Sequence, residues 1–234
     1  MNHFLSISFT AFLFIACNAG KEKTASTTNN AITDSSKPNN INLPDSNQQL
    51  IAVADTTPVS ASRLIIPGKS IGLTSINQKM EEAMKHLGPP ASEDAAMGGK
   101  ELDTWYSKPV VHGTDTVINE TEIFFTSNMN EEGSDQTTRV KHIRITSGFF
   151  ATAGHISTGS GLDSVQKYFP GMKKIASYTS PKTKKTVQVY DENKAGIAFE
   201  IDDHNKCVGI TVHKPGDQAY ETYNSLFEEV KFSE

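Results

Sequence analysis

The sequence predicts an α+β domain of two tandem units, each with one helix and about three antiparallel strands, followed by a C-terminal helix. Three observations predict this fold. Two apolar stripes with helical spacing occur, and each ends at a Gly-Pro or Pro-Gly pair. Strand-like segments with alternating apolar residues follow each stripe. Helical spacing returns near the end of the chain, in Tyr220, Tyr223, Phe227 and Val230.

The chain begins with an apolar run from Phe4 to Ala16 that stops at Cys17. A bilayer core needs about 20 apolar residues in a helix, so this shorter run does not span it. Its length is typical of a signal-peptide core, and we expect a signal peptide over residues 1–16. An ordinary secretory leader cleaved near Ala19-Gly20 stays open as an alternative.

The stretch Phe14-Ile15-Ala16-Cys17 resembles the lipobox of bacterial lipoproteins. The resemblance implies that the Cys17 thiol carries a diacylglycerol and becomes the acylated N-terminus. Two or more acyl chains hold a protein durably on a membrane, whereas one holds it only marginally. The resemblance therefore implies a lipid-anchored protein of the bacterial cell envelope. Asn18, in place of the Asp that retains some lipoproteins at the inner membrane, favours the outer membrane.

Residues 17–61 form the predicted tether, since no Phe, Tyr or Trp occurs between Asn18 and Ala61. Such a segment buries too little apolar surface to offset the entropy of ordering, so we expect it to be disordered. As a flexible coil it reaches roughly 35–40 Å. Its patch Leu50–Val53 could instead dock on the domain as an edge strand. The remaining residues, 62–234, suffice for one sizeable core or for two small modules.

The first unit spans residues 62–150. Ser75 and Gln78 form a plausible capping box, and Gly88-Pro89 ends the predicted helix. The helical stripe consists of Ile76, Met80, Ala83, Met84 and Leu87. The strand-like segments that follow are KELDTWYS, TEIFFTS and RVKHIRITSG.

The second unit spans residues 151–234 and includes the C-terminal helix. Ser160 and Asp163 suit a helix cap, and Pro170-Gly171 ends the helix whose stripe is Leu162, Val165 and Phe169. The strand-like segments that follow are KTVQVYDE, AGIAFEIDD and KCVGITVHK. The turn cluster DDHNK predicts a hairpin between the last two segments.

Alternation within this hairpin predicts which side chains face the core. Ile197, Phe199 and Ile201 should face inward and Glu200 outward, and Cys207 should lie on the face opposite Ile210. A single, unrepeated α+β fold stays open as an alternative to tandem units.

The order of elements from Leu64 to Val212 resembles the small helix-plus-sheet modules of bacterial envelope lipoproteins. In tandem, it also resembles the beta-lactamase inhibitory protein fold, in which two such modules present a concave sheet to a partner. The resemblance implies binding through a sheet face. Those inhibitors carry disulfides that this chain cannot form, because Cys207 is the only thiol left once Cys17 is acylated. No binding residue is carried over.

The sequence contains no catalytic or phosphate-binding motif, and we expect no catalytic, cofactor or metal residues. The net charge of −5 argues against a nucleic-acid partner. Other candidates have structural interpretations. Gly159-Ser160-Gly161 is interpreted as a helix entry, Asp191–Gly196 as a turn rather than a calcium loop, and Asn128–Gln136 as a solvated loop. Cys207 is interpreted as a packing residue, and the aromatics Trp105, Tyr106 and Phe124 as core residues.

Two larger sets are interpreted in the same way. The histidines are scattered, without metal-ligand spacing: His112, His142, His155, His204 and His213. The lysines form a basic, solvated loop: Lys173, Lys174, Lys182, Lys184 and Lys185.

We therefore expect a lipid-anchored, non-enzymatic envelope protein that binds a protein or an envelope polymer such as a glycan through a sheet face. Its membrane contact is the acylated Cys17. The alternatives are an envelope hydrolase or metal-dependent enzyme whose residues converge only in three dimensions, or a purely structural module.

Overall fold

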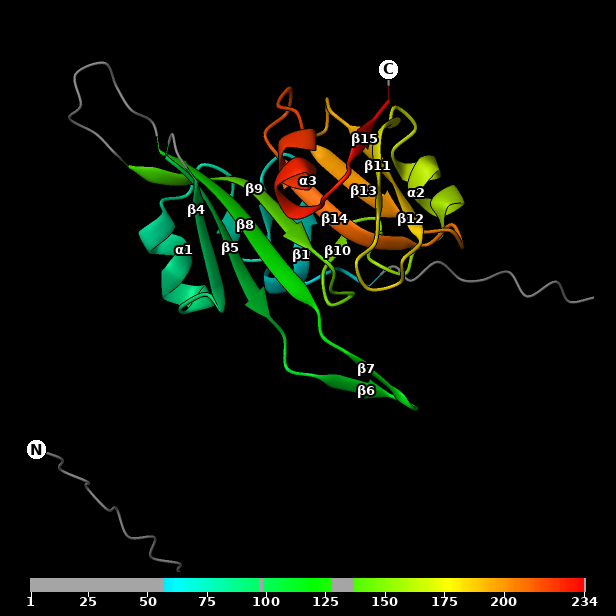
Figure 1. The fold of residues 1–234 in the computed structure, drawn as a ribbon, viewed down its shortest axis with the longest axis horizontal. Coiled ribbons are helices and arrows are strands. Elements are labelled where there is room, and N and C mark those ends of the chain that lie inside the picture. Colours follow the sequence, from blue (N-terminus) through cyan, green and yellow to red (C-terminus); the bar gives the residue numbers. More distant parts are fainter. Residues whose placement is uncertain (1–56, 97–98, 128–136, 234) are drawn as a thin grey trace, which may run out of the picture. The chain divides into compact units, whose positions relative to one another are not determined.

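The computed structural model describes residues 57–96, 99–127 and 137–233, and the molecule is α+β, with strands predominating (Figure 1). The predicted signal peptide, Cys17, nearly all of the predicted tether and the loop Asn128–Gln136 lie outside the described residues. The compact unit Ala52–Glu234 contains every element that follows.

The helices of the described part are short. They are the 3-10 turn η1 (Ala61–Arg63), α1 (Met80–Leu87), α2 (Leu162–Tyr168) and α3 (Tyr220–Leu226). The strands are β1 (Leu64–Ile66), β2 (Ser70–Ile71), β3 (Thr74–Ser75), β4 (Ser92–Ala96), β5 (Lys100–Tyr106), β6 (Val110–His112), β7 (Asp115–Val117), β8 (Glu120–Ser127), β9 (Thr138–Ile145), β10 (Ala151–Thr152), β11 (Lys173–Thr179), β12 (Thr186–Glu192), β13 (Ile197–Ile201), β14 (Cys207–His213) and β15 (Lys231–Phe232).

Nine strands form one sheet in the order β15-β11-β12-β13-β14-β9-β8-β5-β4. Strands that follow the first predicted helix meet strands that follow the second where β9 pairs antiparallel with β14. The strands of both predicted units thus lie in a single sheet. A smaller sheet has the order β10-β1-β2-β3, and β6 pairs with β7 as a separate hairpin.

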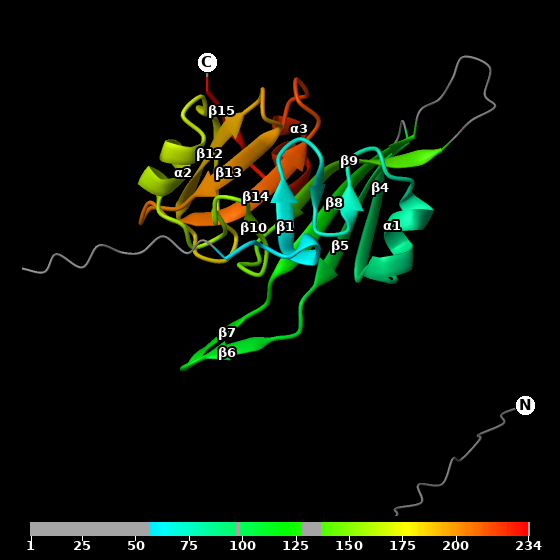
Figure 2. The same ribbon diagram turned by 180° about the vertical axis from the view of Figure 1, so that it is seen from behind.

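One face of the large sheet, here called the core face, carries the main apolar cluster. The small sheet, α1 and α2 pack on it through Ile65, Ala83 and Val165, which are all buried (Figure 2). The sheet supplies Ile123, Phe125, Val140, Ile143, Ile145, Ile197, Phe199, Ile201, Cys207, Ile210 and Val212. Burying a side chain of this kind stabilises the fold by about 1.5–3 kcal/mol, so this cluster is the principal source of stability.

The opposite face, here called the α3 face, is covered in part by α3 and the segment that follows it (Figure 1). Ala219 and Tyr223 are buried against Val187, Val189 and Ala198 of the sheet. Tyr223 also donates its hydroxyl to Thr211 Oγ1 at 2.9 Å. The predicted terminal stripe ran to Val230, but α3 ends at Leu226 and the chain continues into β15.

Both internal helices begin later than their caps predicted. Ser75 receives the expected contact, because its amide donates to Gln78 Oε1 at 2.9 Å. However, Asn77 has a φ of 66°, a left-handed conformation that interrupts the turn, and the N-cap of α1 is Lys79. In α2 the N-cap is Gly161, while Ser160 Oγ accepts from the Ser157 amide.

The predicted hairpin is confirmed, since β13 pairs antiparallel with β14, but the face predicted for Cys207 and the solvent exposure predicted for Glu200 were wrong. A register shift lies between Glu200 and Ile201, so that Glu200 pairs with Gly209 and Ile201 with Cys207. This bulge places Cys207 on the core face with Ile210. Glu200, predicted to face outward, is fully buried on the α3 face.

Some strands could not be predicted from the sequence, because their apolar and polar residues do not alternate. β4 is exposed along its whole length, and β11 begins with the two lysines assigned above to a loop. These strands form because their neighbours supply a ladder, which is a tertiary cause rather than a local propensity.

Candidate functional site

A buried network of charged groups lies on the α3 face of the large sheet. Arg144 of β9 donates from Nε to Glu200 Oε1 and from Nη2 to Glu200 Oε2, each at 2.6 Å. Its Nη1 donates to Glu122 of β8. Tyr178 of β11 donates its hydroxyl to Glu200 Oε2 at 2.6 Å. Because the three charged side chains are almost fully buried, these contacts replace lost hydration.

The electrostatics of this network keep its arginine charged and its tyrosine neutral. Burial alone would lower the pKa of Arg144, but the carboxylates of Glu200 and Glu122 hold it well above its ordinary value. Burial raises the pKa of Glu122, and Arg144 opposes that rise. Burial, followed by the neighbouring Glu200, also raises the pKa of Tyr178. The network is therefore a fixed ion-paired surface rather than a source of transferable protons.

Gly209 makes room for the Glu200 carboxyl group. A Cβ atom built at this glycine would lie 2.5 Å from Glu200 Cδ, which is closer than non-bonded atoms approach. Phe227, the residue after α3, stacks on Tyr178 with ring centroids 3.7 Å apart and lies 5.3 Å from the Arg144 guanidinium carbon. The bidentate salt bridge between Arg144 and Glu200 is thus enclosed by Gly209 beside the carboxyl group and by Phe227 beside the guanidinium group.

This network forms part of the floor of a concavity of about 530 Å³, here called the charged groove. Its walls come from the start of β8, the β11–β12 loop, the β13–β14 turn and the segment after α3. Apolar lining comes from Val117, Ile118 and Phe227.

The rim of the charged groove carries charges of both signs. Lys182 reaches Glu120 Oε1 at 2.8 Å, which joins the β11–β12 loop to the start of β8. Lys185 pairs with Asp203 Oδ2 at 2.7 Å. Exposed pairs of this type contribute about 0–1 kcal/mol, so a ligand can displace them at little cost.

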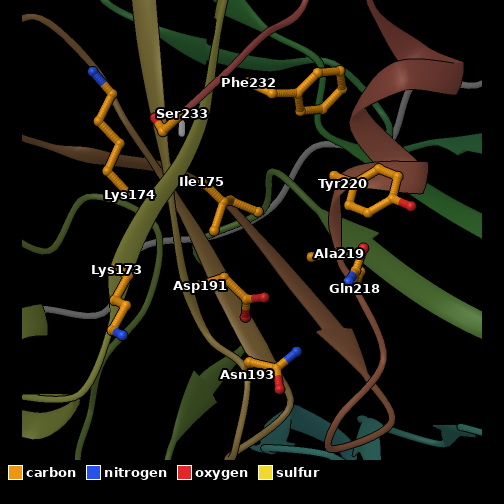
Figure 3. A pocket seen from close by; sticks show the side chains of 10 residues that line it. All are labelled: Lys173, Lys174, Ile175, Asp191, Asn193, Gln218, Ala219, Tyr220, Phe232 and Ser233. Atoms are coloured by element: carbon orange, nitrogen blue, oxygen red, sulfur yellow. The ribbon is translucent and has the colours of Figure 1, made fainter.

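A second concavity, of about 540 Å³, lies beside the N-terminal end of α3 and is here called the aromatic pocket. In Figure 3, Lys173 and Lys174 lie on one side of Asp191, and the rings of Tyr220 and Phe232 lie on the other. The remaining lining residues are Ile175, Asn193, Gln218, Ala219 and Ser233. The two rings meet edge to face, with centroids 5.6 Å apart.

Two polar side chains of the aromatic pocket are held by bonds from outside it. His213 of β14 places Nε2 3.0 Å from Asp191 Oδ1 and Nδ1 3.0 Å from the Lys214 carbonyl oxygen, so both nitrogens face acceptors. Asn193 donates from Nδ2 to the Asp217 carbonyl oxygen at 2.5 Å. The pocket wall is therefore arranged before any ligand arrives.

The histidines named from the sequence are only partly brought together. His142 and His213 are cross-strand partners of β9 and β14, with ring centroids 5.9 Å apart. Nδ1 of His142 shares a hydrogen bond with Thr222 Oγ1 at 2.5 Å, whereas its Nε2 has no partner among the described residues. Burial, helped by His213 and Lys141, lowers the pKa of His142 to about 3. His142 is therefore neutral and acts as a packing residue beneath α3.

Cys207 has the environment of a structural thiol. It is buried, its Sγ donates to the Gly209 carbonyl oxygen at 3.3 Å, and burial raises its pKa. A thiol that stays protonated is a poor nucleophile.

The aromatic residues named from the sequence lie in different environments. Trp105 packs against the core and donates Nε1 to the Gly88 carbonyl oxygen at 3.2 Å. Phe124 is buried and stacks on His142, but Tyr106 is 54% exposed and so is not part of the core.

One group of side chains on the groove rim has the spacing of metal ligands. Ligand atoms of Asp202, Asp203 and His204 lie within 4.8 Å of one another. However, Asp202 Oδ1 already accepts the amides of His204 and Lys206, and Asp203 pairs with Lys185. These bonds account for the turn without an ion. The turn predicted over Asp191–Gly196 is shorter than expected, because Asp191 and Glu192 end β12 and only residues 193–196 form the turn.

Sequence reasoning missed the Arg144 network and the Asp191–His213 pair. Their signal was a charged residue at an interior strand position, such as Glu200 between Phe199 and Ile201. Alternation made Glu200 look solvent-facing, but these residues are buried on the α3 face, where Phe227 from the end of the chain lies over Arg144. The basic segment is also divided: Lys173 and Lys174 line the aromatic pocket, whereas Lys182 and Lys185 line the charged groove.

Comparisons with known proteins give little information about this chain. No family model matches the chain, and no curated protein matches it. A solved structure of a DUF4309 family protein (YjgB) from Bacillus subtilis is similar, with 12% sequence identity, a TM-score of 0.35, and coverage of 63% of this chain and 88% of that one. At this TM-score the similarity supports no argument. Among the described helices, none has the length and apolarity that crossing a membrane requires.

Proposed function

We propose that the chain is a non-enzymatic, lipid-anchored protein of the bacterial cell envelope that binds a partner in the charged groove. The lipobox-like stretch ending at Cys17 supports the anchor, and Asn18 favours the outer membrane. The predicted tether would give the domain a reach of roughly 35–40 Å from the headgroups. The sequence predicted binding through a sheet face. Because α3 covers part of the α3 face, we place the binding site on this face beside α3.

The observation that carries this proposal is the chemistry of the groove. Its floor is buried and ion-paired, and its rim offers exposed charges of both signs beside apolar surface. A polypeptide segment has the matching mixture of charged and apolar side chains. A glycan, the other partner expected from the sequence, presents apolar surface on its ring faces, and Val117 and Ile118 are branched side chains that offer no flat ring for such a face to stack on.

A binding role fits this groove better than catalysis. A general acid or base needs a titratable group within reach of the substrate and poised near neutral pH. Here Glu200 is bound by both Arg144 and Tyr178, and Cys207 is a protonated, buried thiol. The hydrolase alternative would need groups other than these.

We further propose that the chain after the tether consists of two tandem units, residues 62–150 and 151–234, whose strands merged into one sheet. Each contributes a helix to the core face, α1 or α2, followed by antiparallel strands. The C-terminal helix α3 is then an addition to the second unit that covers the α3 face.

The anchor is tested by replacing Cys17 with Ser and fractionating cells. We expect the variant to leave the membrane fraction, and mass spectrometry of the native protein to find an acylated residue 17 as its N-terminus. Membrane association that survives the replacement, or a mature chain that begins beyond Cys17, would contradict the anchor.

The groove is tested by site-specific photocrosslinking. A photoreactive residue at Thr183, on the groove rim, is compared with one at Glu81, an exposed position of α1 on the other face of the sheet. We expect a discrete adduct from the Thr183 position only, and its loss when Lys182 and Lys185 are both changed to Glu. Equal adducts from both positions, or an adduct that survives charge reversal, would refute binding in this groove.

A further inference from the structure

We infer that the aromatic pocket is a second ligand site, separate from the charged groove, and that it takes an acidic sugar. The inference rests on the geometry around Asp191, not on the groove or the anchor. Ligand pockets in proteins usually measure 300–1,000 Å³ and combine apolar surface with a few fixed polar groups. This pocket, at about 540 Å³, has both.

The aromatic side of the pocket offers a ring-sized apolar surface. Tyr220 and Phe232 are 39% and 51% exposed, although large hydrophobic side chains are usually buried. Phe232 is not loosely placed, because it pairs with Ala176 in the ladder between β15 and β11. The Ser233 amide then donates to the Ile175 carbonyl oxygen at 2.9 Å. The two rings therefore form a fixed platform at the mouth of the pocket.

The polar side of the pocket requires a ligand with hydroxyl groups. Asp191 is only 6% exposed, and His213 binds one of its two carboxylate oxygens. A ligand that covered this carboxylate without supplying a donor would leave a buried acceptor unpaired, which is costly. Asn193 and Gln218 carry amides that both donate and accept, as hydroxyl groups do. A purely aromatic or aliphatic ligand is thereby disfavoured.

The lysines specify a negative charge on the ligand. Lys173 lies directly across the ladder from Asp191, yet neither Lys173 nor Lys174 forms an ion pair with any described residue. An unpaired ammonium beside a carboxylate-lined pocket is suited to a carboxylate or similar anion carried by the same ligand. A sugar ring with a carboxylate satisfies all three sides, because its apolar face stacks on the rings and its hydroxyl groups meet Asp191 and the amides.

The test is a titration of the full chain carrying Cys17→Ser, followed by amide chemical-shift mapping. The probe is glucuronate, and glucose, acetate and a nucleoside monophosphate are the comparisons. For a ligand of about a dozen non-hydrogen atoms we expect a dissociation constant on the order of 1 mM. Shifts should cluster at the residues that line the aromatic pocket, and glucose and acetate should bind at least about fivefold more weakly.

Two exposed variants and one matched control complete the experiment. Phe232→Ala and Lys173→Ala should each weaken glucuronate binding about fivefold. Lys173→Ala should leave glucose binding unchanged. The control is Phe149→Ala, because Phe149 is 53% exposed and does not line this pocket.

Four results would overturn the inference: no shifts at about 20 mM glucuronate, shifts that cluster in the charged groove, equal binding of glucose and glucuronate, or tighter binding of the nucleotide. A Phe149→Ala variant that weakens binding as much as Phe232→Ala would also count against it. Retained binding in both pocket variants would refute the assignment of these residues.

Discussion

Replacing Asp103 with Asn should change how stability depends on pH, because this aspartate is buried without a partner. Asp103 lies in β5 on the core face, and both of its carboxylate oxygens lack hydrogen bonds within the described part of the molecule. It is 0% exposed. Its cross-strand neighbour is Glu93, and Glu101 lies two residues away on the same strand. Burial, followed by the charges of Glu101 and Glu93, raises the pKa of Asp103 from 3.8 to about 7.

The sign of the effect follows from the proton balance. Below about pH 4 the carboxyl group is protonated in both the folded and the unfolded chain. Between the two pKa values the unfolded chain releases the proton and the folded chain keeps it, so stability falls as pH rises. Above pH 7 the penalty is complete. The difference between the two pKa values corresponds to about 4 kcal/mol. Water near the exposed strand β4 screens these charges, so we expect about 2 kcal/mol.

The assay is chemical denaturation of the native chain and of Asp103→Asn at pH 4 and pH 8. Asparagine does not ionise, so the unfolding free energy of the variant minus that of the native chain should increase by about 2 kcal/mol between these pH values. Asp94→Asn is the matched control, because Asp94 lies in β4 and is exposed. A difference that stays constant with pH for Asp103→Asn, or that changes equally for the control, would refute the reasoning.

Three further outcomes follow, two from the α3 face and one from the core face. Arg144→Met should lower the unfolding free energy by about 3–5 kcal/mol, because it leaves buried carboxylates unpaired; a denaturant midpoint close to the native value would contradict this. Tyr223→Phe should cost about 1 kcal/mol by removing the hydrogen bond to Thr211, as measured by the same unfolding curves, and a larger loss would indicate another role. Cys207 in the native fold should react with a thiol reagent far more slowly than in denaturant, and equal rates would show that the thiol is accessible.

Much of the sheet could be predicted from local pattern. Alternating apolar residues in the sequence marked β8, β9, β12, β13 and β14. In the structure, burial alternates clearly only in β12, and residues on both faces of the other four strands are buried. Helical spacing placed α1 and α2 near their true positions. Helix starts were less predictable, because the left-handed Asn77 reflects its surroundings and not the cap residues.

The candidate sites could not be predicted in the same way. Glu200 and Arg144 have the alternation of solvent-facing residues, and they are buried only because Phe227 and α3 arrive from the end of the chain. The bulge beside Ile201 moved Cys207 to the core face, and no local sequence feature indicated it. Contacts between residues far apart in the chain determine both results.

By itself, the sequence determined the class of the fold and most of its central strands, because apolar and polar residues alternate along these strands with the two-residue period of a β-strand. It also supplied the grounds for proposing an anchor at Cys17. Only the tertiary structure decided which polar residues meet. Arg144 pairs with Glu200, which lies 56 residues away in the sequence, and His213 pairs with Asp191, which lies 22 residues away. Pairing at such distances depends on register and on what covers each face, which the local pattern does not encode.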